Sequence, residues 1–599
     1  MNQYLIFAKA SLRGVPIQLL LGLCALVVIL TGCGSQSNTQ NQQSTPVTLP
    51  TLQDLGQLPP GAQGAISQGT LAPNTIVQLN IGLQTNRQQL AGDLAALYDP
   101  NSPNYLHFFK PADLASRYGA SQATIDQVSA FLTSQGFQIA SVSKLRDSIK
   151  VKATVAQIAQ AFHIALQNFQ LNGQTFFGPT GQFSLPAAVK PLISYVQGLS
   201  SFAKPTHDLA FDPNTPAKGS ASCNGIQGVV PGQIATAYDY TDAYKKGYYG
   251  GVNLGVVEFN DAVLADDVNG FLACTTKGAK LSYEAVGVDG GAQNPDADSS
   301  FEATLDIEYL AALAPGAHII EYQGQACDSN PCQSNIGFAQ ALNDVFGTIA
   351  QDGRVAVVSV SWGAPEEAFT SDDFNAIDQQ LANLDAEGVT VVISEGDCGA
   401  FATGRYNHLS IQYPGSDPSV LSVGGTILQT DGQGHRKSET VWYNSKPDHS
   451  NCGAGGGWGT GGGISQVWKE PGYQAGKGVK NKYSDGARQV PDVAAIAYHA
   501  AVLFQGQVGG ANGTSIAAPV WAAGIAIVDE GLIKNKNEVL GDPTSFYAVA
   551  NKAASKHPYY DVTKGNNLYY PATANWDCST GWGTPNLFNF ANAFGAFSK

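Results

Sequence analysis

Charged side chains are scarce in this chain of 599 residues. Asp, Glu, Lys and Arg make up 13% of it, about half of the ~25% that is usual in globular proteins. Acidic residues outnumber basic ones, and the net charge at pH 7 is −15. No basic patch stands out, and an acidic surface repels a polyanion, so nucleic acid is excluded as a partner. A chain with few ionisable groups gains little charge in acid, which favours an acidic habitat.

The N-terminus combines basic residues with a short apolar run, which is the pattern of an export signal. Lys9 and Arg13 precede the apolar residues 15–30, and small residues follow. The sequence Leu30-Thr31-Gly32-Cys33 resembles a bacterial lipoprotein box. This resemblance implies that residues 1–32 are removed and that a lipid on Cys33 anchors the protein to a membrane. An uncleaved membrane helix is the alternative, which the shortness of the run disfavours.

Composition and periodicity divide the rest of the chain. Residues 33–50 are rich in Ser, Gln, Asn and Thr and are expected to form a flexible tether. Residues 51–203 show the strand and helix pattern of a small α/β sandwich, with a capping box at Thr154–Gln157. Residues 204–228 contain several prolines and glycines and are predicted to be an exposed linker that is open to proteolysis.

Residues 229–599 alternate apolar, strand-like runs with helix-like segments. The strand-like runs are residues 254–259, 318–322, 355–361 and 389–394. The helix-like segments include residues 338–349 and 373–386. This alternation predicts an α/β fold with a doubly wound, mostly parallel sheet. Sites in such folds lie outside the carboxyl ends of the strands.

A glycine-rich loop that leads into a helix carries the candidate nucleophile. The stretch Gly510-Ala511-Asn512-Gly513-Thr514-Ser515 is followed by small apolar residues and a helix-like segment. Ser515 is therefore predicted at a helix N-terminus, where unpaired backbone N–H groups can receive an oxyanion. For this stretch alone, an ordinary N-cap serine is the alternative.

Subtilases require a His-Gly dipeptide at the start of a helix, and this chain has none. Its second half contains six histidines, all predicted to be ordinary residues: His318, His408, His435, His449, His499 and His557. Acidic residues are the candidates for the role that a catalytic histidine would otherwise have. Glu302 and Asp306 share one face of a predicted helix, where one can hold a proton for the other. Asp397 follows an apolar strand and, when protonated, could donate to an oxyanion. The alternatives are a solvated acidic face and a turn-forming Asp.

Together these residues resemble the sedolisin, or serine-carboxyl peptidase, family. Further motifs carry the resemblance: Leu106-His107-Phe108-Phe109-Lys110-Pro111, Val230-Pro231-Gly232-Gln233, Tyr413-Pro414, Ser422-Val423-Gly424-Gly425-Thr426, Gly461-Gly462-Gly463-Ile464-Ser465 and Arg488-Gln489-Val490-Pro491-Asp492-Val493. The family implies a subtilisin-like peptidase domain over residues 229–599. A pro-kumamolisin-like activation prodomain would precede it over residues 51–203.

The same resemblance implies a role for each candidate residue. Ser515 would be the nucleophile and Glu302 its general base. Asp306 would orient Glu302 and share a proton with it. Asp397 would serve the oxyanion hole together with the backbone N–H of Ser515.

The resemblance also implies one structural Ca²⁺ near the C-terminus. Residues 560–567 and 573–577 are similar to the calcium loops of the family. Asp561 and Asp577 would give carboxylate oxygens, and the carbonyl oxygens would come from Val562, Thr573 and Asn575. Ca²⁺ takes six or more oxygens of these kinds. Without the resemblance, the segments would be interpreted as two Asp-containing turns.

Seven cysteines follow Cys33: Cys223, Cys274, Cys327, Cys332, Cys398, Cys452 and Cys578. In an exported protein some of them are expected to pair, and Cys327 with Cys332 could close a tight loop. An odd number leaves at least one thiol that is free or paired outside the chain.

We therefore predict an exported, lipid-anchored precursor of an acid-active serine-type endopeptidase. Its partners would be protein or peptide substrates and, through Cys33, a membrane. Self-processing would release an extracellular, monomeric enzyme. A neutral subtilase is the alternative enzyme, and a lipoprotein that binds peptides without cleaving them is the alternative from another class.

Overall fold

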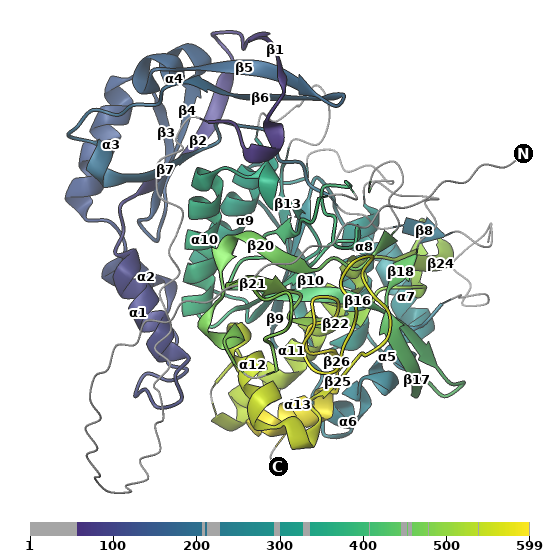
Figure 1. Ribbon diagram of the computed structural model, residues 1–599. Helices are drawn as coiled ribbons and strands as arrows, with labels where there is room; N and C mark the ends of the chain where they lie inside the picture. The colour runs from purple at the N-terminus through teal and green to yellow at the C-terminus, as the bar shows by residue number, and fades with distance from the viewer. Residues whose placement is uncertain are drawn as a thin grey trace, which may run out of the picture. The chain divides into compact units, whose positions relative to one another are not determined.

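The computed structural model shows the fold that carries the candidate residues (Figure 1). It describes residues 57–206, 210–212, 228–292, 300–326, 336–405, 408–444, 452, 458–476, 478–536 and 538–597. The export signal, the tether and the Cys327–Cys332 pair lie outside the described residues. Ser44–Lys599 form one compact unit.

The prodomain is built from two antiparallel sheets. One has the order β3 (Gln138–Val142), β4 (Ser148–Thr154), β2 (Ile76–Leu83), β7 (Ile193–Gln197). The other has the order β1 (Ile66–Thr70), β5 (Ile164–Leu171), β6 (Gln174–Gly181). The helices are α1 (Arg87–Leu97), α2 (Pro111–Arg117), α3 (Gln122–Ser134) and α4 (Val155–Phe162). The capping box predicted at Thr154 and Gln157 starts α4 and is confirmed.

A large, mostly parallel sheet forms the centre of the peptidase domain. Its strands run in the order β10 (Tyr283–Gly287), β11 (His318–Gly324), β9 (Asn253–Phe259), β12 (Val357–Val360), β14 (Thr390–Ser394), β16 (Leu421–Thr430), β17 (Arg436–Val441). Strand β22 (Val493–Ile496) also pairs with β16. All of these pairs are parallel except that between β16 and β17. The predicted doubly wound α/β fold is therefore confirmed.

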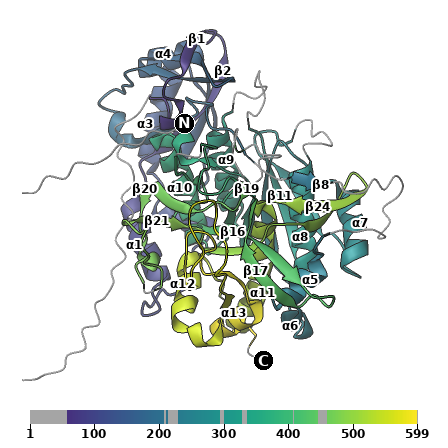
Figure 2. The same ribbon diagram turned by 45° about the vertical axis from the view of Figure 1, so that its right-hand side comes forward.

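Helices cover both faces of this sheet, and each face has its own apolar core. On one face α8 (Phe301–Leu313) packs against α11 (Thr514–Lys536). On the other, α9 (Phe338–Asp352) packs against α10 (Ser371–Ala386). Figures 1 and 2 both show α9 and α10 side by side. The remaining helices of the domain include α5 (Pro231–Ala237), α6 (Tyr240–Lys245), α7 (Ala265–Thr275), α12 (Pro543–Lys552) and α13 (Leu587–Phe594).

Helix α11 is long and apolar enough to cross a membrane, with a mean hydropathy of 1.6 over its apolar window. However, 94% of that window is buried inside the protein. Its contacts are with α8 and with strands β12, β14, β16 and β22. Helix α11 is therefore the central core helix of the peptidase domain, and its first turn carries Ser515.

Candidate active site

Two core helices bring three of the predicted catalytic residues together. Glu302 and Asp306 lie one turn apart on α8, and Ser515 lies in the first turn of α11. Glu302 and Asp306 are fully buried, and Ser515 is 3% exposed. The Ser515 hydroxyl lies near the carboxyl group of Glu302. The structure thus places a hydroxyl beside a pair of carboxyl groups, as the sequence predicts.

The environment of the two carboxyl groups favours shared protonation. Burial and the neighbouring charge of Asp306 raise the pKa of Glu302 well above its usual range, and the nearby hydroxyl of Ser515 opposes this rise. Burial also raises the pKa of Asp306 well above its usual range. Ser361 Oγ opposes that shift by donating to Asp306 Oδ2 at 2.7 Å. Two carboxylates this close cannot both ionise easily, so one proton stabilises the pair.

A third buried carboxyl group, Glu258, extends this pair and was not predicted from the sequence. It lies on β9 and accepts a hydrogen bond from Trp362 Nε1 at 2.9 Å. Burial, followed by the charges of Asp306 and Glu302, raises its pKa well above its usual range. The available sequence signal was one acid inside an otherwise apolar core strand, where charged residues are rare unless they are paired.

Asp397 follows β14 and is tied to the residue before the nucleophile. Its Oδ1 accepts hydrogen bonds from Thr514 N and Thr514 Oγ1, both at 2.7 Å. Thr514 Oγ1 in turn accepts a hydrogen bond from Gly396 N at 3.1 Å. Because Thr514 precedes Ser515, these bonds couple the Asp397 loop to the start of α11. Asp397 is 2% exposed.

A small cavity joins Asp397 to Ser515. It has about 180 Å³ of empty space, and its lining residues are Thr206, Ser361, Ser394, Gly396, Asp397, Gln412, Thr514 and Ser515. Within the described part of the chain, no histidine lines it. All four predicted catalytic residues therefore contribute to one site, which is lined mainly by polar groups.

A disulfide fastens the loop that carries Asp397. Cys398 is bonded to Cys452, and Cys452 Sγ lies 3.7 Å from the carbonyl oxygen of Asp397. Gly459 N donates to that same oxygen at 2.9 Å. Of the other described cysteines, Cys274 is disulfide-bonded and Cys578 is free and buried. The spacing of the cysteines alone did not reveal the Cys398–Cys452 pair, because 54 positions separate its members.

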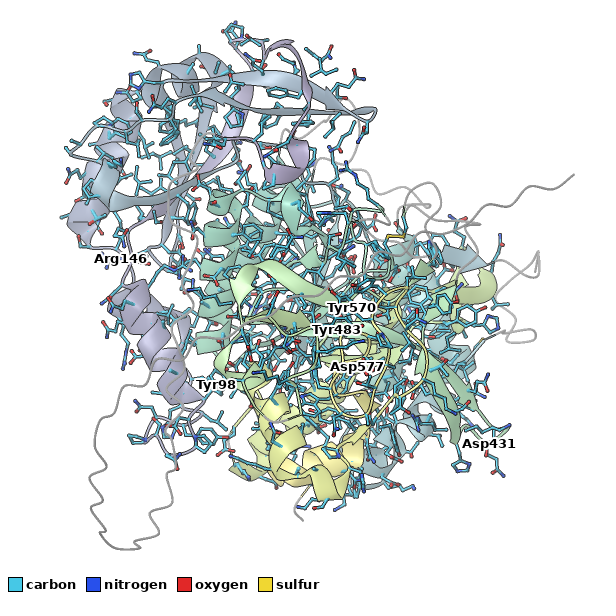
Figure 3. The ribbon with its side chains drawn as sticks, in the orientation of Figure 1. Tyr98, Arg146, Asp431, Tyr483, Tyr570 and Asp577 are labelled. Atoms are coloured by element: carbon cyan, nitrogen blue, oxygen red, sulfur yellow. A yellow bond between two sulfur atoms is a disulfide. The ribbon has the colours of Figure 1, made fainter. Side chains whose placement is uncertain are left out.

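The two predicted calcium loops lie against each other. Asp561 Oδ2 accepts a hydrogen bond from Asn575 N, and Asp577 Oδ2 accepts one from Thr573 N, at 2.9 and 2.8 Å. Burial raises the pKa of Asp577 to about 6 and also raises that of Asp561. Figure 3 labels Asp577. Within the described residues, no group of three or more His, Cys, Asp or Glu could hold a metal ion, so a cation here would need carbonyl ligands as well.

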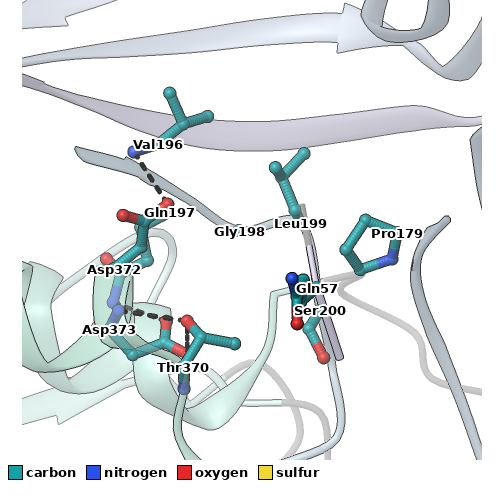
Figure 4. Close-up of a pocket in the computed structure, with 10 residues that line it drawn as sticks. All are labelled: Gln57, Pro179, Val196, Gln197, Gly198, Leu199, Ser200, Thr370, Asp372 and Asp373. Carbon is teal, nitrogen blue, oxygen red and sulfur yellow. Dashed lines mark hydrogen bonds between the residues drawn. The ribbon is translucent and has the colours of Figure 1, made fainter. Parts of the chain in front are cut away.

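The prodomain docks through polar contacts on α10 and on the loop after β10. Arg87 forms an ion pair with Asp378, and Lys150 Nζ lies 2.8 Å from Asp289 Oδ1. A second cavity, with about 300 Å³ of empty space, lies at this interface. Figure 4 shows Val196 and Gln197 of the prodomain facing the N-terminus of α10 there. This cavity shares no lining residue with the one at Ser515.

Comparisons with known proteins agree with this architecture. Residues 63–202 match the family model "Pro-kumamolisin, activation domain", and residues 290–583 match the model "Subtilase family". The chain is 28% identical to kumamolisin of Bacillus sp. over 79% of this chain and 83% of that protein. It is 27% identical to sedolisin of Pseudomonas sp. over 86% and 85% of the two chains.

A solved structure supports the same relationship. Pseudomonas sedolisin, a serine-carboxyl proteinase complexed with pseudo-iodotyrostatin, superposes with a TM-score of 0.53 at 27% identity. The match covers 62% of this chain and 98% of that one. The chain therefore belongs to the sedolisin and kumamolisin family and is a serine-carboxyl peptidase with a pro-kumamolisin activation domain.

Proposed function

We propose that this peptidase cleaves proteins and peptides in acid through an acyl-enzyme on Ser515. The observation that carries the proposal is the buried carboxyl pair of Glu302 and Asp306 on α8, which lies beside the hydroxyl of Ser515. Ser515 Oγ attacks the substrate carbonyl carbon and passes its proton to Glu302, which Asp306 orients. Glu302 then protonates the leaving amine, and water hydrolyses the ester by the same route.

Asp397 makes the proposed activity dependent on acid. Negative charge develops on the carbonyl oxygen during attack, and a donor that meets it stabilises the transition state. A protonated Asp397 can donate there together with the backbone N–H of Ser515, whereas an ionised Asp397 would repel the oxyanion. We therefore expect activity to fall as the pH rises.

Casein digestion at pH 4 and pH 8 tests the activity directly. The wild type should digest casein at pH 4 and be labelled on Ser515 by a fluorophosphonate, and Ser515→Ala should do neither. Equal turnover at both pH values would favour a neutral subtilase. Binding of casein without any cleavage would favour a peptide-binding lipoprotein.

Two described parts of the linker between the domains pair with the peptidase domain near the active site. Thr206 pairs in antiparallel fashion with Gly363, and β8 (Ala210–Asp212) pairs in antiparallel fashion with β24 (Gln507–Asn512). Ala210 opposes Asn512, three positions before Ser515. The chain thus approaches the nucleophile from both sides, and we propose that the first bond cut lies between Thr206 and Ala210. Mass spectrometry of the new N-terminus in acid, beside uncleaved Ser515→Ala, tests this.

We further propose one structural Ca²⁺ held by Asp561, Asp577 and the carbonyl oxygens of Val562, Thr573 and Asn575. The donor set consists of oxygens, which suits a hard cation. The hydrogen bond from Asn575 N to Asp561 joins the two segments, and the one from Thr573 N to Asp577 lies within the second segment. The ion would neutralise two partly buried acids and would have no part in the chemical steps.

Lipid anchoring through Cys33 is a separate proposal, supported by the sequence before it. The precursor would be exported and membrane-bound, and the cut between Thr206 and Ala210 would release a monomeric peptidase outside the cell. Cys33→Ala should move the precursor from the membrane fraction to the medium. Membrane association that survives this change would contradict the anchor.

A further inference from the structure

The side chain of Thr206 makes two contacts with the peptidase domain. Its Oγ1 donates a hydrogen bond to the carbonyl oxygen of Gly363 at 2.7 Å. The same oxygen accepts one from Gln412 Nε2 at 3.4 Å. The backbone N–H of Thr206 also donates to Gly363 O, at 3.0 Å. The hydroxyl is thus met by an acceptor and a donor, in addition to the backbone pairing that any residue could make.

Gln412 is held in place for this contact. It is 4% exposed and lines the cavity that also contains Ser515. Two glycines enclose its amide: a Cβ on Gly363 would lie 2.6 Å from Gln412 Oε1, and a Cβ on Gly396 would lie 2.5 Å from Gln412 Nε2. Any side chain at either glycine would displace the amide. The amide therefore lies in the wall of this cavity, in contact with Thr206.

We propose that Gln412 and the carbonyl of Gly363 form a specificity subsite for a hydroxyl side chain. The subsite would select Thr or Ser in the substrate at the position that pairs with Gly363, on the amino side of the bond cut. This inference rests on the proposed function, because it treats the linker as a bound substrate. It adds a determinant of sequence preference that none of the catalytic residues provides.

The preference follows from the hydrogen bonds that buried polar groups would lose: Gly363 O would keep only the backbone N–H, and Gln412 Nε2 would lose the hydroxyl acceptor. A substrate with Val in place of Thr has nearly the same shape but can neither donate to Gly363 O nor accept from Gln412. Both groups are enclosed in the complex, so each loses a partner without gaining water. Ser keeps the hydroxyl and loses only a methyl group, and Ala loses both.

Quenched fluorescent peptides with the linker sequence 202–212 test the preference on the matured wild-type enzyme. We expect kcat/KM to be about tenfold lower for the peptide with Thr206→Val than for the parent, with Thr206→Ser close to the parent. Equal cleavage of all these peptides would overturn the subsite. Failure to cleave any of them or casein would instead overturn the proposed function, so the two failures are distinguishable.

Gln412→Leu tests the residue itself, and Gln433→Leu, at an exposed turn, is the matched control. The ratio of kcat/KM between the Thr and Val peptides is the readout, because it cancels any general loss of activity. The ratio should fall from about tenfold to about threefold in Gln412→Leu and stay unchanged in Gln433→Leu. An unchanged ratio in Gln412→Leu would remove Gln412 from the subsite. If that variant does not fold, the peptide series on the wild type still decides whether the hydroxyl is selected.

Discussion

The catalytic carboxyl pair and the proposed calcium loops each contain two acids, but the two regions hold them differently. Glu302 and Asp306 lie on one helix in the core, fully buried. Asp561 and Asp577 lie on irregular loops, where Asp561 accepts a hydrogen bond from Asn575 N of the facing loop and Asp577 accepts one from Thr573 N of its own loop. A shared proton relieves the repulsion in the first pair, and a cation would relieve it in the second. The first arrangement should therefore control turnover and the second should control stability.

Among the changes that distinguish the two regions, Asp306→Asn should have the largest effect, and the effect should be on kcat. Without the charge of Asp306, the pKa of Glu302 falls, because that charge contributes to raising it. The loss of a positioned proton partner should lower kcat by roughly 100- to 10,000-fold, while Tm changes little. Glu308→Gln is the control, since Glu308 is a buried acid of the same helix that accepts hydrogen bonds from Leu503 N instead. An equal loss of kcat in both variants would contradict the assigned role.

Opening the disulfide beside Asp397 should have a smaller effect on turnover. In Cys452→Ser the Asp397 loop loses its covalent tie but keeps the hydrogen bonds to Thr514. A small displacement of Asp397 should reduce kcat by roughly tenfold, with KM nearly unchanged. Cys274→Ser also removes one disulfide from the domain, and it should lower Tm without lowering kcat. The positioning role would be wrong if kcat fell equally in the two variants.

Removing calcium should act on stability alone. EGTA or Asp561→Ala should lower Tm, because saturation at 100 times Kd stabilises a folded protein by about 2.7 kcal/mol. Turnover measured well below Tm should stay near that of the wild type. Protons compete with the cation, since the pKa of Asp577 without it is about 6. The rise in Tm on adding Ca²⁺ should therefore be larger at pH 7 than at pH 4.

Matching melting curves with and without chelator at pH 7 would remove the calcium site from this account. A fall in kcat with no change in Tm would show that these loops take part in turnover, and the distinction between the two regions would then fail.

The difference between a regular helix and irregular loops also explains which parts of the fold and of the site could be predicted from the sequence. Regular spacing placed Glu302 and Asp306 on one helical face, and the alternation of strands and helices predicted the doubly wound sheet. Residues that reach the site from distant parts of the sequence were missed. One is Glu258 on β9, beside the carboxyl pair. The other is Cys452, which lies 54 positions from its disulfide partner Cys398. Their positions depend on strand order and loop packing, which a single sequence does not specify. The calcium loops have no periodicity and were predicted only through a family resemblance.

The central claim is that carboxyl groups, and not a histidine, perform the catalysis. Its most direct test is the pH dependence of kcat/KM for the wild type and Asp397→Asn on a soluble peptide. The wild type should be most active in acid. Its acidic limb should report loss of the negative charge shared by Glu302 and Asp306. Its alkaline limb should report ionisation of Asp397. Asp397→Asn keeps a neutral donor at every pH, so it should retain some activity and show a flattened alkaline limb. Maximal wild-type turnover at pH 8, or an alkaline limb that the substitution leaves unchanged, would contradict this account.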